Sequence, residues 1–293
     1  MVTLSTGSRV ATWTIAPTAA PRTTPVIFLH GGPGMFTTQA AMDKGAALRA
    51  AGFTTLYFDQ AGGGKSDRLP AVQYRLQRAV DDVEGLRIAI KAERVILWGS
   101  SYGADVVALY ARQHPGKIAG LIFTSPGFLP GTSGKRNYNL TNQGKVDISG
   151  PLGKAVRLID SKGAAAEPEL SQASAGLLFD EIVNAELLEG GVCRGAPPSP
   201  PRVLSGGNLY ANRLIAKDVK STKLPTAAPP VAPAITIHGE CDFIPIANAE
   251  SYRAAFGGTL VSIAKSGHNL SENRVALDAA LLAFGTVALV GVE

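Results

Sequence analysis

The sequence is poor in cysteine, histidine and charged residues, and each shortage excludes a class of protein. Its 293 residues include 2 cysteines and 4 histidines. Cys193 and Cys241 are too few for a disulfide framework and lack metal-ligand spacing, so we expect no metal site and a buried, unreactive thiol at Cys241. A reducing compartment, and therefore a cytoplasmic location, is the simplest prediction.

Basic runs and interleaved aromatic residues are also missing. The net charge is +5, but Lys and Arg residues are scattered among acidic ones, and aromatic residues make up 6% of the chain. We therefore expect no nucleic-acid partner. Residues 1–10 lack the charged start and apolar core of a signal peptide. The one long apolar stretch, 275–292, is interrupted by Asp278 and two glycines, which favours a closing helix over a membrane span and predicts no membrane partner.

What the sequence does contain is a repeated alternation of short apolar runs and helical patterns. Continuous apolar runs are typical of strands buried on both faces of a parallel sheet, and such strands need helical crossovers. We predict an α/β protein with a mostly parallel central sheet and helices on both faces. The predicted strands are a hairpin within 2–15 and runs at 26–29, 53–58, 94–98, 118–123, 234–238 and 259–264; the predicted helices cover 40–50, 74–91, 104–113, 246–255 and 270–284.

The alternation stops after residue 127 and resumes near residue 234. The intervening residues 128–228 show helical patterns at 150–160 and 173–189, separated by Pro/Gly-rich segments. We interpret residues 128–228 as an inserted helical lid on a core formed by 1–127 and 229–293.

The residues Gly99-Ser-Ser-Tyr-Gly103 stand between a predicted strand and a predicted helix. In a G-x-S-x-G turn, the small flanking residues let the chain reverse sharply and leave the central serine exposed at the strand end. The strand before and the helix after supply the context that this motif requires. Ser101 is therefore the candidate nucleophile, and a plain Gly/Ser turn is the alternative.

A serine hydroxyl needs a base within hydrogen-bond reach, and imidazole is the usual one. His268 lies in a loop that leaves the last strand at the carboxyl edge of the sheet, where Ser101 also emerges. His30 and His238 adjoin glycines at strand ends, where a structural role is expected, and His114 follows a helix in a surface turn. We therefore predict His268 as the base.

The imidazole needs a carboxylate to orient it and to stabilise its developing charge. Asp242 follows the preceding strand by a four-residue turn and faces the same edge. Glu240 is the competitor, but it follows the turn residue Gly239 too closely to point back across the sheet.

The order Ser101, Asp242, His268 on this scaffold resembles the α/β-hydrolase superfamily, many of whose members carry a lid at the same position. The segments His30-Gly-Gly-Pro-Gly34 and Asp59-Gln-Ala-Gly-Gly-Gly-Lys-Ser66 look more specifically like the proline iminopeptidase branch. That branch usually has Asp-Gln-Arg-Gly where this chain has Asp59-Gln-Ala-Gly62, and Trp where it has Tyr102.

The resemblance implies an oxyanion hole made by the N–H groups of Gly32 and Tyr102. Gly31 and Gly32 present bare backbone beside the site, and a residue at the start of a helix has a free amide. We expect Gly31 and Pro33 to contact substrate. A glycine turn without a ligand is the alternative.

These residues predict a serine hydrolase that needs no cofactor and cleaves a small-molecule ester or a short peptide. A carboxylesterase and an aminopeptidase that removes N-terminal proline both remain open, and a ligand receptor on a hydrolase fold is the non-enzyme alternative. The lid has 12 Lys and Arg against 9 Asp and Glu, a net charge of +3, which does not favour a cationic peptide amine. We therefore favour neutral acyl esters.

Overall fold

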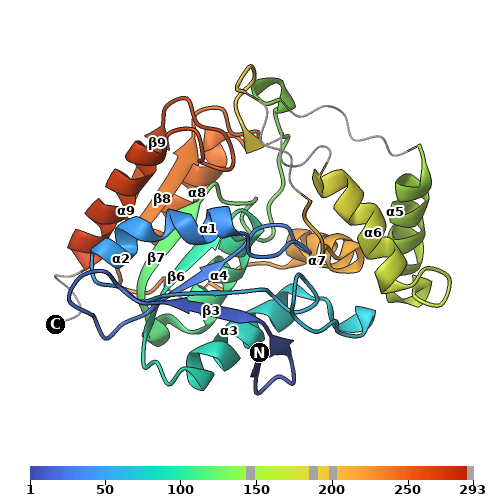
Figure 1. The fold of residues 1–293 in the computed structure, drawn as a ribbon, viewed down its shortest axis with the longest axis horizontal. Helices are drawn as coiled ribbons and strands as arrows, with labels where there is room; N and C mark the ends of the chain where they lie inside the picture. Colours follow the sequence, from blue (N-terminus) through green and yellow to red (C-terminus); the bar gives the residue numbers. More distant parts are fainter. Residues whose placement is uncertain (143–148, 185–190, 198–202, 227, 289–293) are drawn as a thin grey trace.

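The computed structural model describes residues 1–142, 149–184, 191–197, 203–226 and 228–288. Within these ranges, seven strands form one sheet in the order β3-β5-β4-β6-β7-β8-β9 (Figure 1). All neighbouring strands pair in parallel except β3 and β5, which are antiparallel. The predicted mostly parallel sheet is confirmed.

The strands of this sheet lie close to the predicted runs. They are β3 (Thr12–Ile15), β4 (Val26–Leu29), β5 (Thr55–Phe58), β6 (Val95–Ser100), β7 (Ile118–Thr124), β8 (Ala234–Gly239) and β9 (Thr259–Ile263). Every residue of the central strands β4, β6 and β7 is buried except Ser100, at the end of β6. Side chains of a strand point alternately to the two faces, so these continuous apolar runs fill two cores at once.

Helices cover both faces of the sheet, as predicted. One core includes side chains of α3 (Leu76–Ala89), α4 (Tyr102–Gln113) and α8 (Ile246–Phe256). The other includes side chains of α2 (Ala46–Ala50) and α9 (Arg274–Ala288). Since right-handed crossovers bring successive helices to the two faces, the carboxyl ends of the parallel strands form one open edge between them.

Two helices differ from the predicted ones. The helix expected at 40–50 is divided at Gly45 into α1 (Gln39–Lys44) and α2. The closing helix α9 ends at residue 288, and the rest of the apolar stretch to 292 lies outside the described residues. No helix within the described residues is long and apolar enough to span a membrane.

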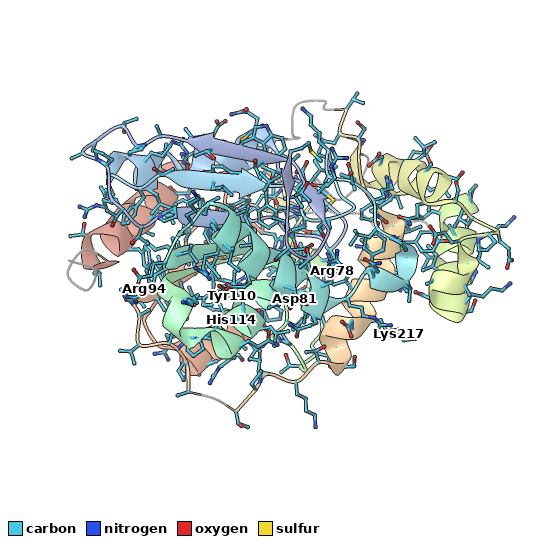
Figure 2. The ribbon with its side chains drawn as sticks, turned by 90° about the horizontal axis from the view of Figure 1, so that it is seen from below. Arg78, Asp81, Arg94, Tyr110, His114 and Lys217 are labelled. Atoms are coloured by element: carbon cyan, nitrogen blue, oxygen red, sulfur yellow. A yellow bond between two sulfur atoms is a disulfide. The ribbon has the colours of Figure 1, made fainter. Side chains whose placement is uncertain are left out.

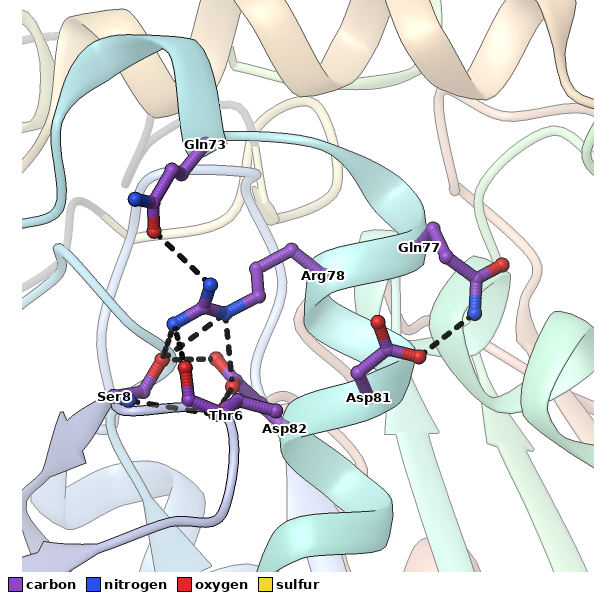
Figure 3. A network of polar contacts seen from close by, with 7 residues as sticks. All are labelled: Thr6, Ser8, Gln73, Gln77, Arg78, Asp81 and Asp82. Atoms are coloured by element: carbon purple, nitrogen blue, oxygen red, sulfur yellow. Dashed lines mark hydrogen bonds and ion pairs between the residues drawn. The ribbon is translucent and has the colours of Figure 1, made fainter.

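The predicted N-terminal hairpin is correct only in part. β1 (Val2–Thr3) and β2 (Arg9–Val10) form a small antiparallel pair, but β3 leaves them and joins the main sheet. Figure 3 shows how the turn between β1 and β2 is attached to α3: Asp82 accepts hydrogen bonds from Thr6 and Ser8, and Arg78 pairs with Asp82. The residues expected to continue the hairpin instead form β3, which pairs with β5.

Within its described residues, the segment between β7 and β8 carries three α-helices, which lie to one side of the sheet in Figure 1. α5 (Pro151–Lys162) and α6 (Gln172–Ile182) match the predicted patterns, although part of the second pattern, 185–189, lies outside the described residues. α7 (Leu209–Ser221) was not predicted; Asn208 caps its first turn by accepting the Ala211 amide. The boundaries 128 and 228 stay a prediction.

The described residues also include four short 3-10 helical turns. They are η1 (Ala71–Gln73), η2 (Pro115–Lys117), η3 (Tyr138–Leu140) and η4 (Gly163–Ala166). The turn η3 lies in the inserted segment close to the carboxyl edge of the sheet, because the neighbouring Asn137 amide donates to the carbonyl of Phe243, which follows β8.

Candidate active site

The turn after β6 holds Ser101 in a conformation that few residues other than glycine adopt. Its φ is 52° and its ψ is −122°, a strained backbone that a well-packed surrounding must impose. A Cβ on Gly99 would lie 2.5 Å from the Gly103 carbonyl oxygen, and one on Gly103 would lie 2.2 Å from that of Leu29. Both glycines of the motif are therefore required by close backbone approach.

Ser101, His268 and Asp242 are brought together at the carboxyl edge of the sheet. The Ser101 Oγ lies 3.0 Å from His268 Nε2, and His268 Nδ1 lies 2.8 Å from Asp242 Oδ1. Because a carboxylate only accepts hydrogen bonds, His268 Nδ1 carries the proton, which leaves Nε2 to accept from the serine hydroxyl. This is the arrangement in which an imidazole can take a proton from serine.

The carboxyl group of Asp242 is fully buried, yet it stays ionised. Burial raises its pKa, but the facing His268 ring, the hydrogen bond to that ring and the Ile244 amide together outweigh burial and lower the pKa below its ordinary value. The Ile244 amide donates to the same Oδ1 at 2.8 Å. A buried carboxylate held ionised is suited to orient an imidazole and to stabilise its positive form.

The alternative acid Glu240 and the histidine His30 form hydrogen bonds with other groups. Glu240 Oε2 accepts the Lys265 amide at 2.8 Å. His30 is buried, with Nδ1 donating to the Gly31 carbonyl and Nε2 accepting the Gln60 amide; burial lowers its pKa. These bonds shape the turns around His30 and leave no role in proton transfer to Ser101.

The other two histidines also lie apart from Ser101. His238 Nε2 donates to the Ile244 carbonyl at 2.8 Å. His114 packs against Tyr110, with ring centroids 4.6 Å apart, and Figure 2 shows both side chains together at the end of α4 away from the serine.

Of the two glycines expected beside the nucleophile, Gly31 is in contact with it. A Cβ on Gly31 would lie 2.9 Å from Ser101 Cβ, so any side chain at this position would collide with the serine. Gly32 has a φ of 131°, and its peptide bond to Pro33 is cis. Tyr102 is the first residue of α4, so its amide has no acceptor within the helix.

The expectation of two free cysteines is wrong. Cys193 and Cys241 form a disulfide with Cα atoms 5.2 Å apart. They are separated by 48 positions in sequence, and only the folding of the inserted segment back onto the loop after β8 brings them together. Cys241 immediately precedes Asp242, so the disulfide ties the inserted segment to the loop that carries the acid.

Two neighbours of His268 were not identified from the sequence. The Phe243 ring packs on the His268 ring with centroids 4.3 Å apart. Glu272 accepts hydrogen bonds from the amides of Gly267 and Cys193, at 3.1 and 2.8 Å. In the sequence, position was the only indication for either residue: Phe243 directly follows Asp242, and Glu272 lies four residues after His268.

Within the described ranges, no group of three or more His, Cys, Asp and Glu side chains could hold a metal ion.

Comparison with known proteins agrees with this fold. Residues 24–145 match a family model described as the alpha/beta hydrolase fold. Over 104 residues the chain is 36% identical to the proline iminopeptidase of Heyndrickxia coagulans, covering 35% of each protein. It is also 32% identical over 104 residues to epoxide hydrolase B of Mycobacterium tuberculosis, covering 35% of this chain and 29% of that enzyme.

Among solved structures, an esterase from Exiguobacterium antarcticum aligns with a TM-score of 0.65 and 18% identity, covering 97% of this chain and 98% of the esterase. At this identity the likeness shows the fold alone, and the sequence relatives are matched over only about a third of their length. The matched family model and the solved structure agree that the chain has the α/β-hydrolase fold, and its matched part resembles proline iminopeptidases in sequence.

Proposed function

We propose that this chain is a serine hydrolase that cleaves carboxylic esters through an acyl-enzyme. The observation that carries the proposal is the continuous set of hydrogen bonds from Asp242 through His268 to Ser101. A strained serine at a strand end, facing an imidazole oriented by an ionised carboxylate, is the arrangement needed to attack a carbonyl carbon.

In the proposed reaction, Ser101 Oγ attacks the ester carbonyl while His268 Nε2 takes the hydroxyl proton. The positive charge that develops on His268 faces the Asp242 carboxylate. The C–O bond to the alcohol then breaks, and His268 returns the proton to the leaving alkoxide. Water, deprotonated by His268, attacks the acyl-enzyme and releases the carboxylic acid and free Ser101.

The negative charge on the tetrahedral intermediate requires donors placed in advance. We assign this role to the amides of Gly32 and Tyr102. The Tyr102 amide lies at the positive end of the α4 dipole, which favours an oxyanion. Gly31 and Pro33, on the same loop as Gly32, are the residues we expect to contact the substrate.

Proline iminopeptidase activity is the alternative, because several sequence relatives bear that name. A peptide amine is cationic, and its burial needs a carboxylate partner. Most acidic side chains in the described part of the inserted segment already bind backbone amides or basic side chains: Asp160, Glu167, Glu169, Asp180 and Asp218. Two further glutamates of this segment, Glu186 and Glu189, lie outside the described residues. This distribution favours ester substrates.

The decisive experiment is substitution of the nucleophile. Ser101→Ala should lower kcat by about 10⁴- to 10⁶-fold on short and medium acyl esters and abolish covalent labelling by a phosphonate probe, because the triad acts as a unit. The far-ultraviolet circular dichroism spectrum should stay that of the wild type. A wild-type chain without turnover above the Ser101→Ala background would support a binding protein on a hydrolase fold instead.

The cytoplasmic location stays a prediction. The Cys193–Cys241 disulfide counts against the reasoning behind it, because disulfides persist mainly in oxidising compartments.

A further inference from the structure

Two stretches of the inserted segment form a strap beside the catalytic loops. We define the strap as residues 136–142 and 191–196. The two stretches run antiparallel, with a bridge between Thr141 and Cys193 and a 2.8 Å hydrogen bond from the Arg194 amide to the Leu140 carbonyl. Figure 1 shows them side by side as a green and a gold segment.

The strap is attached to both loops that carry the proposed acid and base. The Asn137 amide donates to the Phe243 carbonyl at 2.7 Å, and the Asn269 amide donates to the Gly191 carbonyl at 2.9 Å. The Cys193–Cys241 disulfide adds a covalent link. A side chain on the strap therefore has a defined position relative to His268.

Arg136, the first residue of the strap, is linked to the imidazole of His268 through one aromatic ring. Its guanidinium carbon is 5.6 Å from the centroid of the Phe243 ring, which itself packs on His268 at 4.3 Å. Arg136 Nη1 donates to the Tyr138 hydroxyl at 3.2 Å, and Tyr138 stacks on Phe243. One aromatic ring thus separates a guanidinium from the proposed catalytic base.

This guanidinium keeps most of its hydrogen-bonding capacity for another group. Arg136 is exposed, and no carboxylate in the described ranges lies within ion-pair distance of it. The acids on the neighbouring catalytic loops, Glu240 and Glu272, accept backbone amides instead. A guanidinium has five N–H donors, and the one bond to Tyr138 leaves a donor pair available.

The charge of Arg136 also acts on α4, the helix that follows Ser101. Burial raises the pKa of Asp105 in α4 well above its ordinary value, and the Arg136 charge partly opposes this effect. Asp105 is occupied by the Tyr252 hydroxyl at 2.7 Å. The guanidinium therefore lies within electrostatic range of the helix that follows the nucleophile.

We propose that Arg136 recognises a carboxylate on the substrate, so that the preferred substrates are esters that carry an anionic group several bonds from the reacting carbonyl. This inference rests on the proposed ester hydrolysis and names its substrate class. The planar guanidinium matches a carboxylate with two parallel hydrogen bonds, which lysine cannot reproduce. Recognition at this exposed position strengthens binding and transition-state stabilisation modestly, and salt weakens it.

The test compares esters that differ only in charge. The 4-nitrophenyl monoesters of glutaric and suberic acid are each compared with the 4-nitrophenyl alkanoate of the same chain length, and the ratio of kcat/KM within each pair is measured at low and high ionic strength. For at least one pair the wild type should favour the carboxylated ester by about fivefold or more, with a smaller ratio at high salt.

Arg136→Gln should bring this ratio to about one, and Arg136→Lys should restore part of it. Lys135→Gln is the matched control, because it removes a neighbouring exposed charge, and it should keep the wild-type ratio. If Arg136 had only a structural role, its substitution would lower kcat/KM for both esters of a pair alike and leave their ratio unchanged.

Three results would overturn the inference while leaving ester hydrolysis intact. They are a wild-type kcat/KM ratio near one for both pairs, an unchanged ratio in Arg136→Gln, or a loss of the preference in Lys135→Gln as large as that in Arg136→Gln. Absence of Ser101-dependent turnover of every ester would contradict the proposed function itself, and the inference with it.

Discussion

Cys193 of the inserted segment is bonded to Cys241, and Cys241 is the residue immediately before Asp242. The same segment accepts the Asn269 amide, one residue after His268. The inserted segment therefore holds both loops that carry the partners of Ser101, and its removal or loosening should affect the site as well as stability.

The first prediction concerns this disulfide. The double variant Cys193→Ala/Cys241→Ala should lose about 4 kcal/mol of unfolding free energy, the chain-entropy value for a closed loop of 48 residues. Its kcat should fall by at least about threefold, because the acid loop loses a constraint beside Asp242. Urea denaturation and ester kinetics measure the two effects.

Dithiothreitol supplies the matched comparison for the disulfide. It should lower the stability of the wild type toward that of the double variant and leave the double variant unchanged. Equal sensitivity of both proteins to the reductant would contradict the assignment.

The second prediction separates the two candidate acids. Asp242→Asn should lower kcat by about 10⁴-fold, since an amide favours the wrong tautomer of the facing imidazole. Glu240→Gln is the matched control: its side chain binds the Lys265 amide and not His268, so kcat should change by less than about threefold. A larger loss of kcat in Glu240→Gln than in Asp242→Asn would show that Glu240, and not Asp242, is the acid that orients His268.

The third prediction concerns Lys44, whose ammonium group donates to the Asn269 carbonyl beside His268. Burial lowers its pKa from 10.5 to about 8, with Arg274 adding to the effect and Glu272 opposing it. Below pH 8 the group is charged in both states, and the cost of burying the charge is fully present. Between about pH 8 and 10.5 the unfolded chain binds the extra proton, so stability rises with pH.

Relative to Lys44→Met, the wild type should therefore gain roughly 2 kcal/mol of unfolding free energy across this window. Urea denaturation of both proteins at pH 7.5 and pH 10 measures the difference. If the difference in unfolding free energy between the two proteins does not vary with pH, the Lys44 charge is not buried.

The fourth prediction concerns the ester and iminopeptidase alternatives. An ester of N-acetylproline should exceed the same ester of free proline in kcat/KM by at least about tenfold, roughly 1.4 kcal/mol of transition-state preference. Both substrates share one leaving group, so intrinsic ester reactivity cancels. A strong preference for the free amine would restore the iminopeptidase, with a carboxylate of the inserted segment as its anchor.

Much of the fold was predictable because its information is local. A strand buried on both faces, such as Val26–Leu29, needs apolar residues at every position, and Gly99 is required by a backbone contact within the turn that holds Ser101. The shared carboxyl edge of parallel strands then predicted that Ser101, Asp242 and His268 would lie near one another, although not that they would be hydrogen-bonded.

The sequence by itself therefore determined the order of strands and helices, the turn that strains Ser101, and the identity of the residues gathered at one edge of the sheet. Only the tertiary structure decided what surrounds them: the pairing of Cys193 with Cys241, the packing of Phe243 on His268, and the position of Arg136. The Phe243–His268 contact joins the loops that follow two neighbouring strands, and the other two depend on how the inserted segment folds back onto those loops. All three join residues that are distant in sequence, so no pattern of neighbouring residues records them.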